Sequence, residues 1–446
     1  MPGKTVFVCQ ECGSSSPKWT GKCPGCGAWS SMVEESNQPA SRTQSNAPPA
    51  RPQALNEISQ AQEQPRISSG FGEVDQVLGG GIVAGGLMLL AGEPGIGKST
   101  LLLQMAAKVA DGHTVLYVSG EESLRQIKLR ADRLGIGDNS LQLLAATDVD
   151  AIIATIADMA PDFVVVDSVQ TISTSRITSS PGTVSQITTT AHMLQEIAKQ
   201  SNTTVLVAGH VTKEGNIAGP KILEHLVDVV LHLEGERFGG LKLLRGVKNR
   251  FGSTHEVGVF EMRDRGMVPI SNPSASFLQE RQAGSGSVVF AAMEGSRALL
   301  VEVQALVNNS PFGYPKRTGA GFDANRLNVL IAVLGQRAGV QLGDKDVYVN
   351  IVGGMKIAEP AADLAVAMAI ASAARQQPVP ADAVVFGEVG LSGEIRSVPN
   401  TQSRIKEAKK LKFTQAFAPA GSGKHSFITP VETMKAAASQ GLSKEA

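Results

Sequence analysis

Short apolar runs alternate with amphipathic stretches through residues 67–270 of the chain. Apolar runs of this length are typical of buried parallel strands. We expect strands at residues 88–91, 114–119, 141–145, 163–167 and 204–209. Helical periodicity follows the first two runs, at residues 101–105 and 125–134. Strands that alternate with helices form parallel sheets covered by helices, so the sequence predicts an α/β domain here.

The rest of the chain departs from this pattern. Residues 36–66 are rich in Pro, Ser, Gln and Asn and have few large apolar side chains, which predicts a flexible linker. Residues 271–286 are interpreted as a connector. Residues 287–446 carry further strand and helix patterns, including a strongly apolar helix at 361–375, and are predicted to form an α+β domain. We therefore expect a small module at residues 1–35 followed by two larger domains.

A glycine-rich segment joins the first apolar run to the helical pattern that follows it. It reads GEPGIGKS over residues 92–99, which is G-x-x-x-x-G-K-[ST] between a strand and a helix. Glycines let backbone N–H groups converge on phosphates, and the helix N-terminus adds its positive dipole end. Lys98 is expected to reach the β- and γ-phosphates, and Ser99 to ligate Mg²⁺. The residues predicted to bind ATP are Gly92, Glu93, Pro94, Gly95, Ile96, Gly97, Lys98, Ser99 and Thr100.

Two more polar side chains end predicted strands of this region. Asp167 follows four apolar residues and is expected to hold Mg²⁺ beside Ser99, as a Walker B acid does. His210 follows the run at 204–209 and is expected to sense the γ-phosphate. The alternative for His210 is an ordinary hydrogen-bonded loop histidine.

An acidic pair follows the run at 114–119. We expect that strand to lie next to the P-loop strand, which would let Glu121 polarise the water that attacks the γ-phosphate. The alternative for Glu121 is an acid that caps the next helix, and its neighbour Glu122 is the better candidate for that duty.

The cysteines lie near the amino terminus, in two C-x-x-C pairs: Cys9, Cys12, Cys23 and Cys26. Four thiolates in this doubled spacing suit the tetrahedral preference of Zn²⁺. A module this short cannot bury enough surface to fold unaided, so the metal is expected to supply folding energy. A redox pair or two unrelated turns are the alternatives. Trp19, Trp29 and Phe7 are expected to pack against the small site.

Charge and hydropathy exclude little else. The chain carries 41 basic and 41 acidic side chains, so no overall positive charge points to nucleic acid, although a local patch can still bind DNA. No apolar run approaches the roughly 18 residues that span a bilayer, and the first residues lack the apolar segment of a signal peptide. We therefore expect a cytoplasmic protein with no membrane partner.

The region 67–270 resembles the RecA/DnaB superfamily of ring-forming ATPases through its P-loop, Asp167 and strand–helix order. Its segment 246–252, GVKNRFG, matches the K-N-R-F-G motif of the bacterial RadA (Sms) family and is similar to the K-x-R-x-G motif of replicative helicases. The resemblance implies that Lys248 and Arg250 act in trans on the γ-phosphate held by a neighbouring subunit, as an arginine finger does. It also implies a homo-hexameric ring. An exposed basic turn between strands is the alternative.

Two polar segments, residues 171–186 and 211–221, follow the last two strands predicted for this region. Both are rich in Ser, Thr and Gly, and their cations include Arg176, Lys213 and Lys221. In RecA-like proteins, loops at these places face a central channel, and flexible polar loops suit sequence-independent contact with the DNA backbone. We expect these three side chains to contact DNA, with ordinary surface loops as the alternative.

The region 287–446 resembles the proteolytic domain of Lon through GGMKIAEPAADLAVAMAIASA and FGEVGLSGEIRSVP. Ala361 stands at the position of Lon's nucleophilic serine, and Gln402 at that of its catalytic lysine. A Ser–Lys mechanism needs both the oxygen and its proton acceptor, so this domain is expected to be inactive as a protease. Instead it is expected to help assemble the ring and to bind DNA, with Lys316 and Arg317 as contacts.

Together these resemblances imply a DNA-dependent ATPase that translocates on single-stranded DNA as a ring-shaped helicase, with ATP, Mg²⁺ and Zn²⁺ as cofactors. The RadA family implies branch migration of recombination intermediates, on single-stranded and branched DNA, together with RecA in DNA repair and homologous recombination. Two alternatives remain: an ATP-dependent Lon-like protease, and a RecA-like switch that binds ATP and DNA without motor activity.

Overall fold

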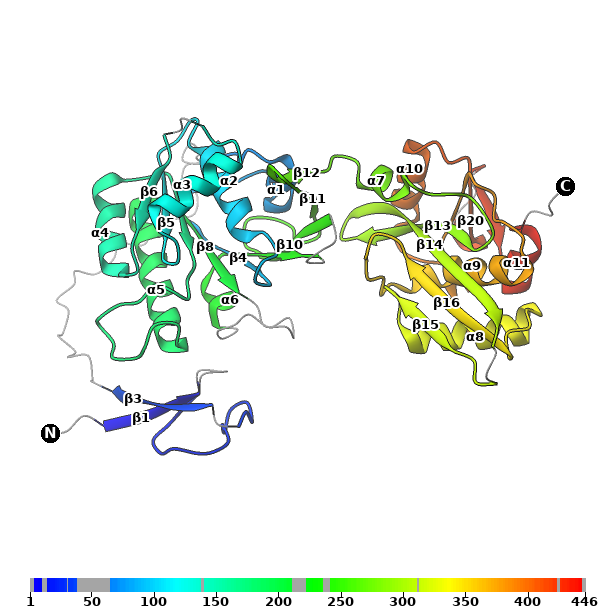
Figure 1. The fold of residues 1–446 in the computed structure, drawn as a ribbon, viewed down its shortest axis with the longest axis horizontal. Coiled ribbons are helices and arrows are strands. Elements are labelled where there is room, and N and C mark those ends of the chain that lie inside the picture. The colour runs from blue at the N-terminus through cyan, green and yellow to red at the C-terminus, as the bar shows by residue number, and fades with distance from the viewer. Residues whose placement is uncertain are drawn as a thin grey trace, which may run out of the picture. The chain divides into compact units, whose positions relative to one another are not determined.

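The computed structural model describes residues 4–9, 14–29, 31–37, 65–137, 140–210, 222–235, 241–310, 313–422 and 426–442. The chain divides into two compact units, Met1–Pro269 and Ile270–Ala446 (Figure 1). Some sequence predictions fall outside the described residues, namely those on Cys12, Lys213, Lys221 and nearly all of the 36–66 linker. In the described part of the chain, no helix combines the length and apolar character needed to cross a membrane.

The amino-terminal module is a three-stranded antiparallel sheet with the strand order β2-β1-β3. Its strands are β1 (Lys4–Cys9), β2 (Ser15–Ser16) and β3 (Met32–Asn37). The interior of the module is a small cluster of Cys9, Cys23 and Met32, against which Phe7 packs. A core of this size excludes little water, so the module depends on something besides apolar burial for its stability.

A nine-stranded sheet organises the rest of the first unit, in the order β12-β11-β10-β9-β4-β8-β7-β5-β6. The strands from β9 to β6 are parallel, and those from β12 to β9 are antiparallel. The strands are β4 (Leu87–Gly92), β5 (Val115–Ser119), β6 (Gln142–Ala145), β7 (Phe163–Asp167), β8 (Thr204–His210), β9 (Val229–Glu234), β10 (Leu241–Asn249), β11 (Val257–Arg263) and β12 (Gly266–Pro269). The helices are α1 (Gly72–Leu78), α2 (Lys98–Val109), α3 (Leu124–Arg133), α4 (Val149–Met159), α5 (Val184–Ser201) and α6 (Ile222–Leu226).

Strand β4 lies in the middle of this sheet, and every one of its residues is buried. Its alternate side chains enter two different cores, because successive side chains of a strand point to opposite faces. Met88 and Leu90 join the core that α1, α2 and α3 cover. Leu87, Leu89 and Ala91 join the core that α4 and α5 cover (Figure 1). Burial on both faces explains why β4 is a continuous apolar run rather than an alternating one.

The α/β prediction is confirmed, and each strand predicted for this region agrees with an observed strand to within one residue at either end. One prediction about sheet order is wrong. The strand that precedes Glu121, β5, does not lie next to the P-loop strand β4; β5 pairs with β6 and β7, and β8 lies between β7 and β4. Crossover connections place the strands of a doubly wound sheet out of sequence order, so neighbours along the chain need not pair.

The second unit is built on a seven-stranded mixed sheet in the order β15-β16-β14-β13-β17-β20-β21, with a separate β18-β19 hairpin. The strands are β13 (Ser287–Glu294), β14 (Arg297–Asn309), β15 (Arg317–Ala320), β16 (Lys345–Ile351), β17 (Ala383–Val385), β18 (Glu388–Val389), β19 (Ile395–Arg396), β20 (Gln415–Pro419) and β21 (Ile428–Val431). The helices are α7 (Pro273–Leu278), α8 (Ala324–Ala338), α9 (Asp363–Arg375), α10 (Thr401–Lys410) and α11 (Met434–Gln440), with 3₁₀ turns at Pro360–Ala362 and Ala420–Ser422.

Helix α7 lies inside the segment that was interpreted from sequence as a connector, so that interpretation is incomplete. Asn272 caps the helix by accepting a hydrogen bond from the N–H of Ala275. The buried hydroxyl of Ser274 accepts the N–H of Leu300 at 3.0 Å and donates to Glu407 at 2.7 Å. These bonds fasten α7 to the sheet and to α10, so this part of the segment belongs to the second unit's fold.

Candidate active site

The glycine-rich loop connects β4 to α2 and adopts backbone angles that other residues avoid. Gly95 has φ of 78° and Gly97 has φ of 117°, both in the region that favours glycine. A Cβ at Gly97 would also lie 2.6 Å from the terminal methyl of Met262. Glycine at this position therefore follows from both the backbone and the space around it.

The amino end of α2 is open to a ligand. Gly97 is its N-cap residue and has no side chain, so no side-chain cap satisfies the first N–H groups of the helix. Lys98, the first residue of the helix, and Ser99 follow at the mouth of the loop. Unsatisfied N–H groups beside a positive helix end fit a phosphate group, so the residues present fit the triphosphate of ATP.

The ammonium of Lys98 is held by the loop itself. Its side chain is 4% exposed, and its Nζ donates to the carbonyl oxygens of Gly92 at 2.8 Å and Glu93 at 3.0 Å. Burial lowers the pKa of Lys98 to about 8, although the nearby carboxylates of Asp167 and Glu121 oppose that shift. A buried cation with this depressed pKa favours an anionic ligand, since the ligand would restore the charge balance that burial removes.

Asp167 ends β7 and is oriented by a residue that the sequence analysis missed. The buried hydroxyl of Tyr117 donates to the Oδ2 of Asp167 at 2.9 Å. Burial and the adjacent carboxylate raise the pKa of Tyr117, so the phenol keeps its proton as a donor. Tyr117 pairs with Val165 across β5 and β7, which sets its ring alongside the strand that ends at Asp167. The only sequence signal was a tyrosine within an apolar strand.

Glu121 and His210 are brought together, as their predicted roles require. The hydroxyl of Ser168 donates to the Oε1 of Glu121 at 2.7 Å, and the Nε2 of His210 lies 3.7 Å from the same oxygen. His210 is paired in register with Gly92, the first residue of the P-loop. Among the residues that the structure describes, none is within hydrogen-bond distance of the buried Nδ1 of His210. These side chains line the carboxyl edge of the sheet beside Lys98.

Glu122 does not cap α3, contrary to the prediction. Ser123 is the N-cap residue and forms a capping box with Gln126, whose backbone N–H it accepts. Glu122 instead forms an ion pair with Arg130 on the same helix. A serine followed three residues later by glutamine is itself a capping signal, and it outweighs the acid that precedes it.

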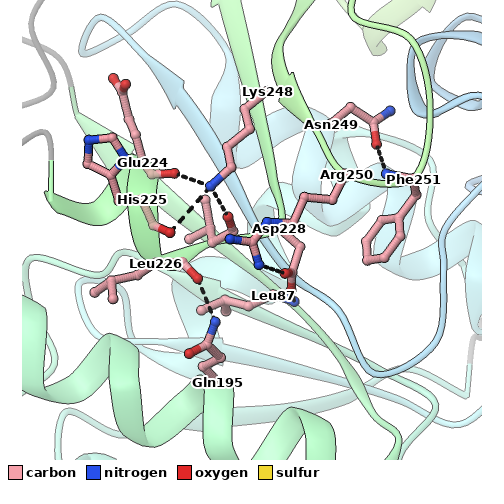
Figure 2. A network of polar contacts seen from close by, with 11 residues as sticks. Leu87, Gln195, Glu224, His225, Leu226, Asp228, Lys248, Asn249, Arg250 and Phe251 are labelled. Atoms are coloured by element: carbon pink, nitrogen blue, oxygen red, sulfur yellow. Dashed lines mark hydrogen bonds and ion pairs between the residues drawn. The ribbon is translucent and has the colours of Figure 1, made fainter.

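The basic turn that carries the family resemblance, residues 248–252, begins at the end of β10 and lies at the amino ends of β9 and β4. The pairing register of β10 with β9 shifts between Gly246 and Lys248, which marks a β-bulge. A bulge re-aims the side chains that follow it. Figure 2 shows that the Lys248 side chain points to the end of α6, where its Nζ donates to the carbonyl oxygens of Glu224 at 2.7 Å, His225 at 3.3 Å and Val227 at 2.8 Å.

Helix α6 therefore has its last carbonyl groups satisfied by two side chains. Lys248 takes three of them, and the amide of Gln195 donates to the fourth, on Leu226, at 2.5 Å (Figure 2). Terminal carbonyls of a helix lack intrahelical partners, and a cation near them also interacts favourably with the helix dipole. Burial lowers the pKa of Lys248, with a smaller contribution from nearby Arg250.

Arg250 forms an ion pair with Asp228, which directly precedes β9 and is hydrogen-bonded to the first residue of β4. Its Nη1 lies 3.0 Å from the Oδ1 of Asp228, while the other carboxylate oxygen accepts the N–H of Leu87 at 3.0 Å (Figure 2). The Asp228 side chain is 9% exposed and that of Arg250 is 54% exposed. Asp228 is therefore buried and bonded to the sheet, whereas the side chain of Arg250 remains partly exposed to solvent.

The turn that carries these residues is itself firmly positioned. Asn249 accepts the N–H of Phe251 at 2.9 Å through its Oδ1 and donates to the carbonyl of Leu78 at 3.3 Å. Arg66 donates to the carbonyls of Leu78 at 2.9 Å and Phe251 at 2.8 Å. Polar side chains thus join the end of α1 to the basic turn. These bonds fix the backbone of the turn from which the side chains of Lys248 and Arg250 extend.

The P-loop and the basic turn lie at opposite ends of β4. Leu87, at the amino end, is bonded to Asp228, and Gly92, at the carboxyl end, begins the P-loop. At about 3.3 Å per residue, these two ends of the strand are about 16 Å apart. The side chain of Arg250 is therefore out of reach of the nucleotide site in its own chain.

Arg176, a predicted DNA contact of the first unit, lies on the segment that follows β7. Arg176 is exposed but pairs with Asp150 at 2.5 Å. The loop around it is held by Gln186, a buried side chain that accepts the N–H of Thr174 and donates to the carbonyl of Ser179. Internal hydrogen bonds from Gln186 therefore hold part of the segment 171–186, and its contact with DNA stays a prediction.

Lys316 and Arg317, the contacts predicted in the second unit, are both exposed. Lys316 leads into β15, where its backbone N–H donates to Asp346 at 2.8 Å. Arg317 is the first residue of β15, an edge strand of the sheet. Both side chains are accessible to a large anionic ligand.

Three of the four cysteines meet in the amino-terminal module. The Sγ atoms of Cys9, Cys23 and Cys26 all lie within 4.8 Å of one another, and those of Cys9 and Cys26 are 3.7 Å apart. Thiolates at about 2.3 Å from a tetrahedral Zn²⁺ would be about 3.8 Å from one another. The donor set and its spacing fit zinc, with Cys12 as the expected fourth ligand.

The prediction that both tryptophans pack against this site is wrong. Trp19 is 60% exposed and Trp29 is 75% exposed, whereas Phe7 does pack against the cysteine cluster. Of the three aromatic residues, Phe7 on β1 is the one that packs against the cysteine cluster.

The second unit has no serine nucleophile where the Lon resemblance would place one. Ala361 is 2% exposed within the 3₁₀ turn that precedes α9. Close by in the sequence, Glu359 forms an ion pair with Arg404, a side chain that is 1% exposed. Arg404 also lies 5.8 Å from the ring centres of Phe290 and Phe386. A buried cation held by aromatic rings and a carboxylate serves packing, and no hydroxyl at position 361 can act on a peptide bond.

Comparisons with known proteins agree with this architecture. Family models match residues 51–216 (AAA domain), 7–34 (rubredoxin metal binding domain) and 325–422 (subunit ChlI of Mg-chelatase). DNA repair protein RadA of Bacillus subtilis is 51% identical over 428 residues, which cover 94% of this chain and 93% of that protein. DNA repair protein RadA of Pseudomonas aeruginosa is 49% identical over 424 residues, covering 94% and 93%. The crystal structure of the RadB recombinase is 23% identical with a TM-score of 0.37, covering 46% of this chain and 100% of that one.

The parallel sheet, the P-loop and the acid that ends β7 define a RecA-like P-loop ATPase, preceded by a zinc ribbon. With about half of its residues identical to RadA proteins over nearly its full length, the chain belongs to the RadA family of DNA repair proteins.

Proposed function

We propose that the protein is a DNA-dependent ATPase that works as a ring-shaped translocase on single-stranded DNA. In this proposal it promotes branch migration of recombination intermediates with a RecA recombinase, in DNA repair and homologous recombination. Its membership in a family whose curated relatives are named DNA repair proteins supports the repair role. The nucleotide site and its distance from the basic turn support the ring.

Within one chain, the carboxyl edge of the sheet would bind Mg-ATP. Lys98 would leave the loop carbonyls for the β- and γ-phosphates, and Ser99 would contribute its hydroxyl to Mg²⁺. Asp167, oriented by Tyr117, would hold the hydration shell of the ion. Glu121 would orient the attacking water, since Ser168 and His210 position its carboxylate at that edge.

The observation that carries the proposal is the separation of the two ends of β4. Arg250 lies at the amino end, about 16 Å along the strand from the P-loop, so it cannot complete its own site. In the proposed head-to-tail arrangement of identical subunits, the amino ends of one sheet's strands would meet the carboxyl ends of the next, and such an arrangement forms a ring where the rotation between subunits closes. Arg250 would then stabilise the charge that develops on a neighbour's γ-phosphate.

The two basic residues of the turn would contribute unequally. An ammonium has three donors, and three carbonyl oxygens of α6 surround that of Lys248. A guanidinium has five donors, and Arg250 presents a half-exposed side chain with one observed partner carboxylate. Arg250 is therefore the principal residue to act in trans, and Lys248 would join it only by releasing the end of α6.

DNA would be held by cations that are accessible in both units. Arg176 lies on the segment that follows β7, and Lys316 and Arg317 lie at the start of β15. Contacts with phosphate fix DNA without reading its sequence, which suits a motor that works on any strand. Lys213 and Lys221 remain predictions of the same kind.

The proposal is tested by measuring ATP turnover with and without single-stranded DNA, over a range of protein concentrations. We expect DNA to stimulate turnover and turnover per chain to rise with concentration, since each site is completed by a neighbour. Migration of a branched substrate in the presence of RecA is the second measurement. Turnover that ignores both DNA and dilution would contradict the ring motor.

Two further outcomes identify other functions. ATP-dependent cleavage of casein would reveal a protease, against the expectation from Ala361. ATP and DNA binding without displacement of a strand from a forked substrate would reveal a switch rather than a motor.

A further inference from the structure

The amino-terminal module, a ribbon of residues 4–37 in its described parts, exposes its largest apolar side chains. Trp19 is 60% exposed and Trp29 is 75% exposed, and the chain has no other tryptophan. In the described part of the ribbon, the buried hydrophobic cluster consists of Cys9, Cys23 and Met32, with Phe7 beside them. The ribbon has a very small hydrophobic core, yet both indoles are exposed to water instead of being buried in it. We infer from this exposure that the two tryptophans form an interaction surface.

The two indoles flank one glycine. A Cβ built on Gly21 would lie 3.7 Å from the Cη2 of Trp19 and 3.8 Å from the Cζ3 of Trp29. The six-membered rings of both tryptophans therefore come close to Gly21, which has no side chain to fill the space beside them. A backbone bridge between Lys22 and Trp29 closes this part of the ribbon over the turn that holds Cys23 and Cys26. The metal-binding turn thus fixes the position of Trp29.

The surroundings of the indoles are cationic and polar. Lys22 places its ammonium 5.8 Å from the centre of the Trp29 ring, and Lys18 is exposed beside Trp19. From Ser14 to Trp29 the chain carries these two lysines and no acidic residue. Tryptophans that anchor a protein partner are typically ringed by residues that exclude water. From Ser14 to Trp29 the charged side chains are those of Lys18 and Lys22, which complement an anionic partner instead.

We propose that Trp19 and Trp29 form a stacking platform for the unpaired bases of a single-stranded nucleic acid, with Lys18 and Lys22 contacting its phosphates. Stacking on aromatic faces needs bases that are free of a duplex, and it tolerates every base because each has a π-face. This inference goes beyond the proposed function, which places DNA on the ATPase core and the second unit. It also stands if the motor activity fails.

The chain provides its own reporter for this surface. Both of its tryptophans lie in the ribbon, so the tryptophan fluorescence of the full-length, zinc-loaded protein reports on the ribbon alone. Oligo-dT is the probe, added without nucleotide, and its binding is followed in parallel by the anisotropy of a dye at its end. We expect saturable quenching of tryptophan fluorescence that follows the anisotropy, and little quenching by a blunt duplex of equal length.

Two variants separate stacking from stability. Trp29→Ala should lower the affinity for oligo-dT by about tenfold, as measured from the fluorescence of the remaining tryptophan. Trp29→Phe should retain most of the affinity, since a phenyl ring still stacks. Lys22→Ala should weaken binding more at low than at high salt, and Lys128→Ala, an exposed lysine on α3, serves as its control. Zinc content, measured with a chromogenic chelator, shows whether each ribbon is intact.

The unaltered protein decides the matter even where a variant loses zinc. Oligo-dT that binds by anisotropy and leaves tryptophan fluorescence unchanged would overturn the stacking platform. So would equal quenching by duplex DNA, or a Trp29→Ala variant that keeps its zinc and binds oligo-dT as tightly as the unaltered protein. Arg250→Ala should still show the quenching, which distinguishes failure of this inference from failure of the ring motor.

Discussion

Near each end of strand β4 lies a lysine that donates to backbone carbonyls: Lys98 on α2 and Lys248 on β10. The two lysines differ in whether they are available to bind a ligand. At the carboxyl end, Lys98 donates to two carbonyls of the P-loop, beside a helix whose first N–H groups have no side-chain cap. At the amino end, Lys248 binds three carbonyls that would otherwise leave α6 uncapped. Lys98 is therefore placed to bind phosphate, whereas Lys248 stabilises the fold by capping α6. Its neighbour Arg250 is the group left for a partner.

Lys98→Ala should have the largest effect. Removing the ammonium takes away both the phosphate contact and the charge that balances the site, so we expect no detectable turnover and weakened ATP binding. Turnover is measured at saturating Mg-ATP with single-stranded DNA, and binding with a fluorescent nucleotide. Thermal unfolding serves as the control for folding. Normal turnover in this variant would show that the P-loop is not the active site.

Arg250→Ala should separate turnover from binding. An arginine that acts in trans contributes on the order of 10³-fold to turnover, so we expect a loss of about that size. Nucleotide affinity should stay within a few-fold of the unaltered chain, because Arg250 is far from its own P-loop. Arg263→Ala, which removes an exposed, carboxylate-paired arginine of the same unit, is the matched control. If Arg250→Ala abolished nucleotide binding too, Arg250 would belong to its own chain's site.

The pH dependence of ATP affinity should single out Lys98. Its pKa is lowered to about 8 in the nucleotide-free protein, so above that pH the side chain must take up a proton to meet the phosphates. We therefore expect affinity to be flat below pH 8 and to fall by up to about tenfold per pH unit above it. Calorimetry in two buffers of different ionisation enthalpy would detect the proton uptake. Lys98→Arg should lose this dependence, because a guanidinium does not titrate in this range.

Lys248→Met should have the smallest effect of the four. It leaves three carbonyls at the end of α6 without their donor, and we expect a loss of about 1 kcal/mol in the free energy of unfolding. Lys128→Met removes an exposed lysine of α3 and should cost less than about 0.5 kcal/mol. Urea unfolding measures both. A Lys248→Met variant with unchanged stability and the turnover of Arg250→Ala would show that Lys248 acts directly on the neighbour's nucleotide.

The sequence predicted the carboxyl end of β4 far better than the amino end. The P-loop is a run of consecutive residues, and its glycines, lysine and serine act through local backbone geometry that their order dictates. Lys248 acts through a bulge in β10 and through the end of α6, which lies more than twenty positions earlier in the sequence. No local pattern states which carbonyls a lysine will find, so its structural role became visible only in the fold.

Tyr117 and the two tryptophans are further residues whose surroundings could not be predicted from the sequence. Tyr117 reaches Asp167 from a neighbouring strand, and the order of the strands, which placed β5 away from β4, was not readable from sequence. Apolar composition predicted burial for Trp19 and Trp29, yet the ribbon's core is filled by three residues and Phe7. Composition gives the tendency of a side chain to be buried, whereas the available volume decides which ones are.

The most direct test of the central claim mixes two inactive variants. Lys98→Ala lacks its own nucleotide site but retains Arg250, and Arg250→Ala retains the site but lacks the residue that completes a neighbour. If the two variants occupy positions in a ring at random, about a quarter of the interfaces in an equal mixture join an intact site to an intact Arg250. The account predicts that DNA-stimulated turnover reappears on mixing, at up to that fraction of the unaltered rate. A mixture that remains as inactive as its two components, while the variants are shown to assemble together, would contradict a site shared between subunits.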